Sequence, residues 1–222
     1  MLPFTTEQFF AVFTAYNGAV WPASIAAYVL GAAAVNLAMR GGLVNSRIVS
    51  AILALMWAWT GAVYHMGFFA AINRAAWAFG ALFAAQALLL LYYGAYRNRL
   101  SFGAASNKLR FGAGYLLIGY AAVAYPLIGI ALGHDYMALP QFGVTPCPVT
   151  IFTFGMILLA RKPVPWPVLV IPVLWSLIGG SAAILLNVPQ DWILLVSGLA
   201  TLALLVLARP RSAADVAHLG KK

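Results

Sequence analysis

Charged residues are scarce in this chain of 222 residues. Asp, Glu, Lys and Arg together make up 8% of it, whereas 64% of its residues are hydrophobic. A soluble domain of this length needs far more polar surface to cover its core. The scarcity therefore excludes an ordinary water-soluble protein and indicates that the solvent is a lipid bilayer. Backbone N–H and C=O groups in lipid need internal partners, so we expect an all-α integral membrane protein.

Acidic residues and cysteines are rarer still. Four acidic residues face 13 basic ones, which gives a net charge of +9, but no basic run is interleaved with aromatic residues as in a nucleic-acid-binding surface. We therefore expect no nucleic-acid partner. The single cysteine excludes an internal disulfide and a C-x-x-C redox relay. No basic run precedes the first apolar segment, so we expect no cleaved signal peptide.

Long apolar runs are what the chain does contain, and they predict seven membrane-spanning helices. Thr5 and Gln8 form a capping-box pattern, and Phe9, Phe13 and Tyr16 recur on one helical face, which we expect in the headgroup layer. This pattern predicts an interfacial helix over 1–17 that ends at Asn17-Gly18. The bundle is expected over 18–208 and a tail over 209–222. The predicted spans are about 18–39, 48–70, 75–96, 111–132, 145–160, 166–187 and 191–208.

The basic residues lie on one side of these seven spans. Arg74 is the exception, and it shares the opposite side with Glu7, Asp135 and Asp191. The positive-inside rule then places the N-terminus outside and the C-terminus in the cytoplasm. We expect the bilayer itself as a partner, anionic lipid at the basic cytoplasmic loops, and self-association into a homo-oligomer as an open alternative to a monomer.

The second and third spans resemble the sixth and seventh at a constant offset along the chain. This pattern predicts a 3+1+3 arrangement, in which two parallel three-helix units flank the fourth span, as in some transporters. Chance similarity between apolar helices is the alternative. The matched pairs are Trp57 with Trp175, Gly61 with Gly179, Asn73 with Asp191, and Gly80 with Gly198, and Pro22-x-Ser24-Ile25 pairs with Pro148-x-Thr150-Ile151.

Four residues within the spans have predicted structural roles. Asn73 and Asp191 are the expected N-caps of the third and seventh spans. Gln86 is expected to hydrogen-bond across a helix–helix contact. Pro126 lacks an N–H, so it should free the carbonyl of Ala122 and kink the fourth span.

Polar side chains at membrane depth form the candidate site. Such groups are functional candidates, although Ser and Thr often bond only to their own helix. No carboxylate lies at the bilayer midplane, which argues against a coupled pump. We expect an outward-facing polar cavity for a small neutral solute, in a permease, a channel or a transport-accessory protein. The candidate path comprises His65, Tyr64, Thr60, Cys147, Thr150, Thr153, Trp175, Ser176, Ser181 and Asp191.

Two other functions remain open. His65, His134, Asp135 and Cys147 all fall near the outer face, and imidazole with thiolate suits copper or zinc, so a metal-binding or redox-sensing protein is one alternative. Their spacing matches no metal motif, so we expect no resident cofactor. A Cys–His nucleophile in an enzyme acting on lipid is the other alternative. Nothing marks an oxyanion hole, so the sequence favours a non-enzymatic role.

Motifs spread over nearly every span resemble one known family. They are LPFTTEQFF at the start, YN at 16–17, WP at 21–22, YH at 64–65, FGVTPCPVTIFTFG at 142–155, WSLIGGSAA at 175–183 and PQD at 189–191. With these motifs, the chain resembles a bacterial multi-pass membrane family, domain of unknown function 6064. The resemblance implies a protein of the bacterial cytoplasmic (inner) membrane. It implies no activity, substrate or catalytic residue.

Overall fold

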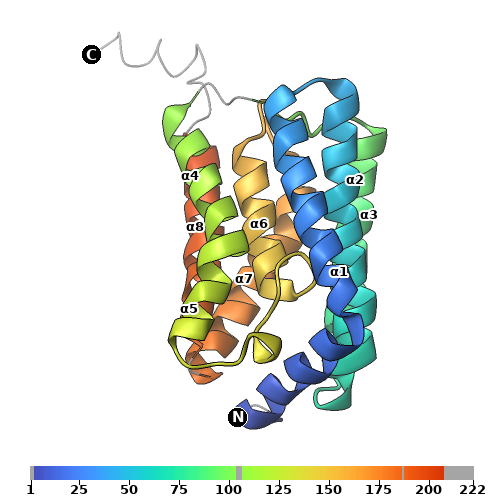
Figure 1. The fold of residues 1–222 in the computed structure, drawn as a ribbon. Coiled ribbons are helices and arrows are strands. Elements are labelled where there is room, and N and C mark those ends of the chain that lie inside the picture. The colour runs from blue at the N-terminus through green and yellow to red at the C-terminus, as the bar shows by residue number, and fades with distance from the viewer. Residues whose placement is uncertain (1–2, 104–106, 187, 208–222) are drawn as a thin grey trace, which may run out of the picture.

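Long helices that run along a common direction make up most of the computed structural model, which describes residues 3–103, 107–186 and 188–207 (Figure 1). Six of them are long and apolar enough to cross a membrane, and they lie at six of the predicted positions. They are α1 (Thr6–Arg40), α2 (Leu43–Trp59) continued by η1 (Thr60–Phe68) and η2 (Phe69–Ala71), α3 (Ala76–Leu90) continued by η3 (Leu91–Tyr96), α4 (Lys108–Gly119) continued by η4 (Tyr120–Ala124) and α5 (Tyr125–Ala131), α7 (Pro167–Leu186), and η6 (Pro189–Asp191) continued by α8 (Trp192–Leu207).

The remaining predicted span is shorter and lies at the centre. Helix α6 (Pro146–Leu158) has 13 residues, all buried, and α2, α4, α7 and α8 pack around it. It rises about 20 Å, against about 30 Å of hydrocarbon in a bilayer, so α6 alone is too short to cross. The chain leading into it is buried as well, from Leu139 onward. Irregular backbone at this depth is tolerated because protein rather than lipid surrounds it.

The outer surface of the bundle is apolar, in contrast to that of a water-soluble protein. Large hydrophobic side chains are exposed on every long helix, among them Trp21, Trp77, Leu116, Leu185 and Val206. Exposed apolar area on this scale marks a surface that contacts lipid or another apolar partner. The composition of the helices and of their outer face therefore indicates a membrane protein.

Helix α1 is kinked, and the kink lies slightly later than predicted. The capping box at its start is confirmed, since Gln8 N–H donates to the Thr5 hydroxyl and the Gln8 side chain accepts from Thr5 N–H. The helix continues through Gly18, and the non-helical residue is Val20 (φ −119°, ψ 15°). Pro22 follows, and its ring disturbs the preceding turn. The predicted break at Asn17-Gly18 is therefore wrong by two to three residues.

Residues near this kink hold the irregular chain that leads into α6. Asn17 Nδ2 donates to two loop carbonyls, that of Met137 at 2.7 Å and that of Leu139 at 2.9 Å. The Tyr16 hydroxyl donates to the carbonyl of Val144 at 2.7 Å. Asn17 is thus an anchor for this loop rather than the turn residue that the sequence suggested.

Charge is segregated between the two ends of the bundle. Basic residues of the described chain sit where α1, η3 and α6 end and where α2 and α4 begin, at the top of Figure 1. Glu7 and Arg74 belong to the opposite end. The basic-end residues are Arg40, Arg47, Arg97, Arg99, Lys108, Arg110, Arg161 and Lys162. The predicted tail, 209–222, lies outside the described residues.

Prolines inside two helices free backbone carbonyls, and side chains from other helices bond to them. Pro126 leaves the carbonyl of Ala122 without its helical donor, and the Tyr28 hydroxyl of α1 donates to it at 2.9 Å. Pro172 does the same to Val168, whose carbonyl accepts from Gln86 Nε2 of α3 at 3.0 Å. The predicted interhelical role of Gln86 is confirmed. A short π-helical segment, η4, precedes Pro126 and accommodates the disturbed turn.

The two predicted N-caps have other hydrogen bonds. Asn73 Oδ1 accepts from Ala75 N–H at 3.0 Å, so it closes the turn before α3 rather than capping α3 itself. Asp191 directly precedes α8 but is buried, and its carboxylate accepts from the Tyr125 hydroxyl.

A double-mutant cycle tests the pairing of Gln86 with the carbonyl freed by Pro172. We expect Gln86→Leu to lower the unfolding free energy by about 0.5–2 kcal/mol, because the Val168 carbonyl loses the donor that replaces its missing helical one. In the Pro172→Ala background the helix supplies its own N–H, so the same change should cost less. Equilibrium unfolding in detergent micelles measures both losses. Equal losses in the two backgrounds would show that Gln86 acts through packing alone.

Candidate functional site

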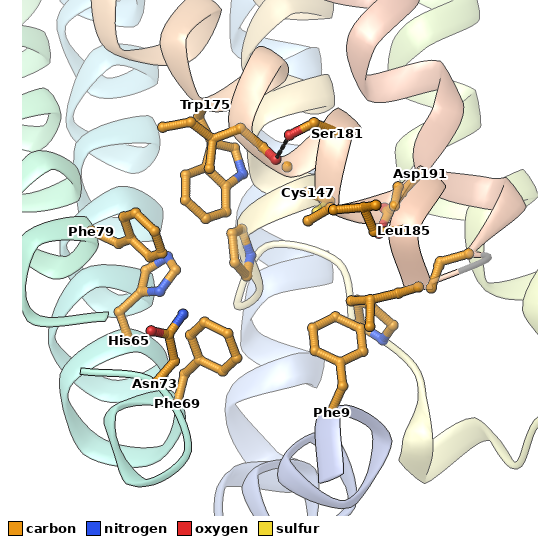
Figure 2. A pocket seen from close by; sticks show the side chains of 18 of the residues that line it. Phe9, His65, Phe69, Asn73, Phe79, Cys147, Trp175, Ser181, Leu185 and Asp191 are labelled. Atoms are coloured by element: carbon orange, nitrogen blue, oxygen red, sulfur yellow. Dashed lines mark hydrogen bonds between the residues drawn. The ribbon is translucent and has the colours of Figure 1, made fainter. Parts of the chain in front are cut away.

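A cavity of about 190 Å³ lies near the end of the bundle opposite the basic residues. Its walls come from the first part of α1, from η1, from the start of α3 and of α6, from α7, and from the turn between α7 and α8 (Figure 2). Seven aromatic rings line it, namely Phe4, Phe9, Phe13, Tyr64, Phe69, Phe79 and Trp175. The polar groups among them are few: His65, Asn73, Cys147, Ser181 and Asp191.

His65 occupies the aromatic side of this cavity. It lies in η1, a π-helical segment of nine residues, and π-helical turns are frequent at functional sites. Its ring meets those of Phe83 and Trp175 edge-on, with centroids 4.7 and 5.1 Å away. The side chain is fully buried, and neither ring nitrogen has a hydrogen-bond partner within the described chain. A neutral imidazole offers one donor and one acceptor, so both functions are unmet here.

Trp175 adds a second unmet donor beside His65. It lies on α7, is 7% exposed, and its Nε1–H has no partner among the described residues. Figure 2 shows its ring over the same space as those of His65 and Phe79. Leaving a buried polar group unpaired costs about 1–3 kcal/mol, so the two rings together carry a notable local penalty.

Cys147 and Asp191 form the opposite wall. Pro146 and Pro148 set Cys147 in the first turn of α6, as the sequence indicated, but its thiol is buried rather than presented to water. It lies beside the Asp191 carboxyl and the Trp175 indole. The Tyr125 hydroxyl donates to the same carboxyl, so one side of Asp191 is already bonded to protein.

The structure brings together six of the ten residues of the predicted path. Those that line the cavity are His65, Tyr64, Cys147, Trp175, Ser181 and Asp191. The other four, which lie deeper in the bundle, each donate a hydroxyl to a carbonyl of their own helix. These bonds are Thr60 to Met56 (2.8 Å), Thr150 to Pro146 (2.8 Å), Thr153 to Val149 (2.8 Å) and Ser176 to Val173 (2.7 Å).

The four candidate metal ligands do not converge. His134 lies in the loop after α5 and stacks on Phe10, with ring centroids 4.5 Å apart. Asp135 accepts from Met137 N–H at 2.7 Å and caps the short helix η5 (Tyr136–Ala138). Neither lines the cavity that holds His65 and Cys147. Within residues 3–103, 107–186 and 188–207, no group of three His, Cys, Asp or Glu side chains could hold a metal ion.

The aromatic residues at the start of α1 were assigned the wrong environment. The sequence suggested that Phe9, Phe13 and Tyr16 face the headgroup layer, but Phe13 and Tyr16 are buried. Phe13 stacks on Tyr64 with centroids 5.2 Å apart, and Phe9 lines the cavity. Their spacing did indicate one apolar helical face. It carries no information on whether that face meets lipid or protein.

Comparison with known proteins gives one match. The model of a family of unknown function (DUF6064) matches residues 6–215, which is most of the chain. No curated protein and no solved structure matches it.

Replacing His65 by phenylalanine tests whether its nitrogens are unpaired. We expect His65→Phe to leave the unfolding free energy unchanged or to raise it by about 1 kcal/mol, because an unmet donor and acceptor are removed from an aromatic environment. Trp57→Phe is the matched control, since Trp57 Nε1 donates to the Thr153 hydroxyl at 2.9 Å. It should lose about 1 kcal/mol in the same unfolding assay. A larger loss at His65 than at Trp57 would contradict the assignment.

Proposed function

Because the chain belongs to the DUF6064 family, whose function is unknown, we propose its function from the geometry of the cavity alone. The protein is a multi-pass protein of the bacterial inner membrane that binds a small, uncharged, largely apolar solute beside His65. It acts as a permease, a channel or a transport-accessory protein for that solute.

The observation that carries this proposal is the pair of unmet hydrogen-bonding functions on His65 at the edge of a cavity. A solute hydroxyl or primary amide can donate to the unprotonated ring nitrogen or accept from the protonated one, so it would satisfy one of the two unmet functions. Concave, mostly apolar pockets with a few converging polar groups are the usual form of small-molecule sites.

The size and lining of the cavity support a small solute. A protein cavity of about 150 Å³ is known to hold benzene, and this one measures about 190 Å³. Its walls are mainly apolar, with five phenylalanine rings among them, so a charged solute would lose its hydration with little compensation. The best fit is a compact, uncharged molecule with a single polar group.

The kink in α1 supports a route for entry. Phe4, Phe9 and Phe13 line the cavity, and all three precede Val20, where α1 departs from helical geometry. A rigid rotation of this segment about Val20 would move one whole aromatic wall, because hinges are confined to a few residues at element ends and irregular positions. Such a rotation would also release the hydrogen bonds that Tyr16 and Asn17 make to the chain before α6, so cavity opening would be coupled to that chain.

The proposal includes the membrane topology expected from the sequence. Residues 139–160, buried throughout, together serve as the seventh crossing, with irregular chain completing the short α6. The basic end then faces the cytoplasm and the cavity faces outward. The 3+1+3 repeat remains part of this proposal. Its support is that Gly61 and Gly80 lie where η1 and α3 cross closely, while Gly179 and Gly198 lie against Leu194 and Ser176 at the α7–α8 contact.

Labelling of single cysteines tests this topology. In a Cys147→Ser background, Asp135→Cys and Lys162→Cys place thiols at exposed positions on opposite ends of the bundle. A membrane-impermeant maleimide should label Asp135→Cys in intact bacterial cells, and Lys162→Cys only after permeabilisation. The reverse pattern would invert the orientation. Labelling of both in intact cells would mean that the two positions lie on the same side.

Binding of matched benzene derivatives tests the function. Phenol, toluene and benzoate share one ring and differ in the single group that His65 would meet. We expect the purified protein to bind phenol about 3- to 10-fold more tightly than toluene, and benzoate least, as one net hydrogen bond predicts. Equilibrium dialysis in detergent measures all three. His65→Phe should remove the preference for phenol and retain toluene, whereas Thr150→Val, outside the cavity, should change neither.

Two outcomes would overturn this function. Equal binding of phenol and toluene by the wild type would mean that His65 contributes no recognition, and absence of binding by all three would mean that the cavity takes no solute of this size. If binding is found, uptake of labelled phenol into liposomes, with and without the protein, separates a permease from an accessory protein.

A further inference from the structure

A second cavity lies on the side of the bundle, between α1 and α4. It measures about 700 Å³, and its floor is formed by Phe152 of α6 and by Phe142 of the chain before it. Figure 1 shows α6 in view between these two helices. Most of the lining is apolar, including Val35 on α1 and Ile118 on α4. We call this cavity the lateral groove.

The lateral groove is as long as one leaflet of a bilayer is thick. Its α1 wall runs from Tyr28 to Met39, which corresponds to a helical rise of about 16 Å. The hydrocarbon core of a bilayer is about 30 Å thick, so the groove extends over about half of it. It occupies the half nearer the basic end, because Met39 is followed directly by Arg40, the last residue of α1.

Two contacts cross the groove and limit its width. The Tyr28 hydroxyl of α1 donates to the carbonyl of Ala122 at one end, and the Tyr115 hydroxyl of α4 contacts Met39 toward the other. Single side chains therefore bridge the two walls. A helix with side chains has a diameter of about 10–12 Å, so a helix from a second copy of this chain does not fit between walls this close. An extended hydrocarbon chain does.

Basic residues surround the open end of the groove. Arg40 at the end of α1 and Lys108 at the start of α4 are exposed. Nearby, the Arg110 guanidinium donates through Nη2 to the carbonyl of Ala160, which follows the C-terminal end of α6. The acidic residues of the described ranges, Glu7, Asp135 and Asp191, belong to other parts of the bundle, at or near its opposite end. Basic pockets between membrane helices are suited to anionic lipid headgroups.

We propose that the lateral groove is a binding site for one anionic phospholipid. One acyl chain lies in the groove against Phe152, and the phosphate is bound by Arg40 and Lys108. This site is independent of the cavity around His65, and it adds a defined lipid position to the general expectation of anionic lipid at the basic loops.

Native mass spectrometry of the detergent-solubilised protein tests the lipid site. The protein is titrated with phosphatidylglycerol and with phosphatidylcholine of identical chains. We expect the wild type to hold one phosphatidylglycerol about 5-fold more tightly than phosphatidylcholine. Arg40→Ala should remove most of this preference, and Arg74→Ala, an exposed basic residue at the other end, should keep it.

A second pair of variants tests the acyl chain. Ala32→Trp places a large ring in the lateral groove, since Ala32 is exposed and lines it. We expect it to weaken binding of both lipids, whereas Ala81→Trp, on the exposed face of α3, should not. Because both alanines are exposed, thermal unfolding should confirm that each variant folds.

Four results would overturn the lipid site. They are equal binding of the two lipids by the wild type, equal effects of Arg40→Ala and Arg74→Ala, full lipid binding by Ala32→Trp, and a change from dimer to monomer in Ala32→Trp. The second result would indicate general surface charge. The last would show that another copy of the chain occupies the groove. None of them bears on phenol binding, so the two proposals fail separately.

Discussion

The pairing of backbone carbonyls determines how this bundle is assembled. Lipid offers no hydrogen bonds, so a carbonyl that loses its helical donor must find another within the protein. The prolines at 126 and 172 each create such a carbonyl, and a side chain from a different helix bonds to it. Each bond joins two helices and fixes how far one is shifted along its axis relative to the other. Sequence features that break helices thus become the features that position them.

The same constraint explains why α6 can be short. Its preceding chain is irregular and packs against α1, where its carbonyls accept from Tyr16 and Asn17. The other helices pack around this segment, and Leu139 through Ala160 are all buried. Burial in protein supplies the partners that its backbone needs. The wall of the cavity that includes Pro146 and Cys147 belongs to this segment.

Hydropathy predicted the six long helices because it measures the solvent that a segment prefers, and these helices are apolar enough to cross a membrane. It could not measure the face that each residue presents to its neighbours. Phe13 and Tyr16 were therefore placed in the headgroup layer, and Thr150 and Thr153 in a polar path, although the former pack inside and the latter bond to their own helix. The predictions for Gln86 and Ala122 succeeded because each rested on a hydrogen bond that had to be satisfied.

His65 combines two unmet hydrogen-bonding functions with a place in the wall of a cavity. Asn17 and Gln86 are also buried, and each keeps an unpaired oxygen, but both donate to carbonyls through their amide nitrogens. Gln190 has neither amide function met, but it does not line the cavity. Packing alone would be served better by phenylalanine at the position of His65. A histidine retained there at a cost in stability is the arrangement expected of a binding group, since functional sites are where proteins depart from otherwise consistent packing rules.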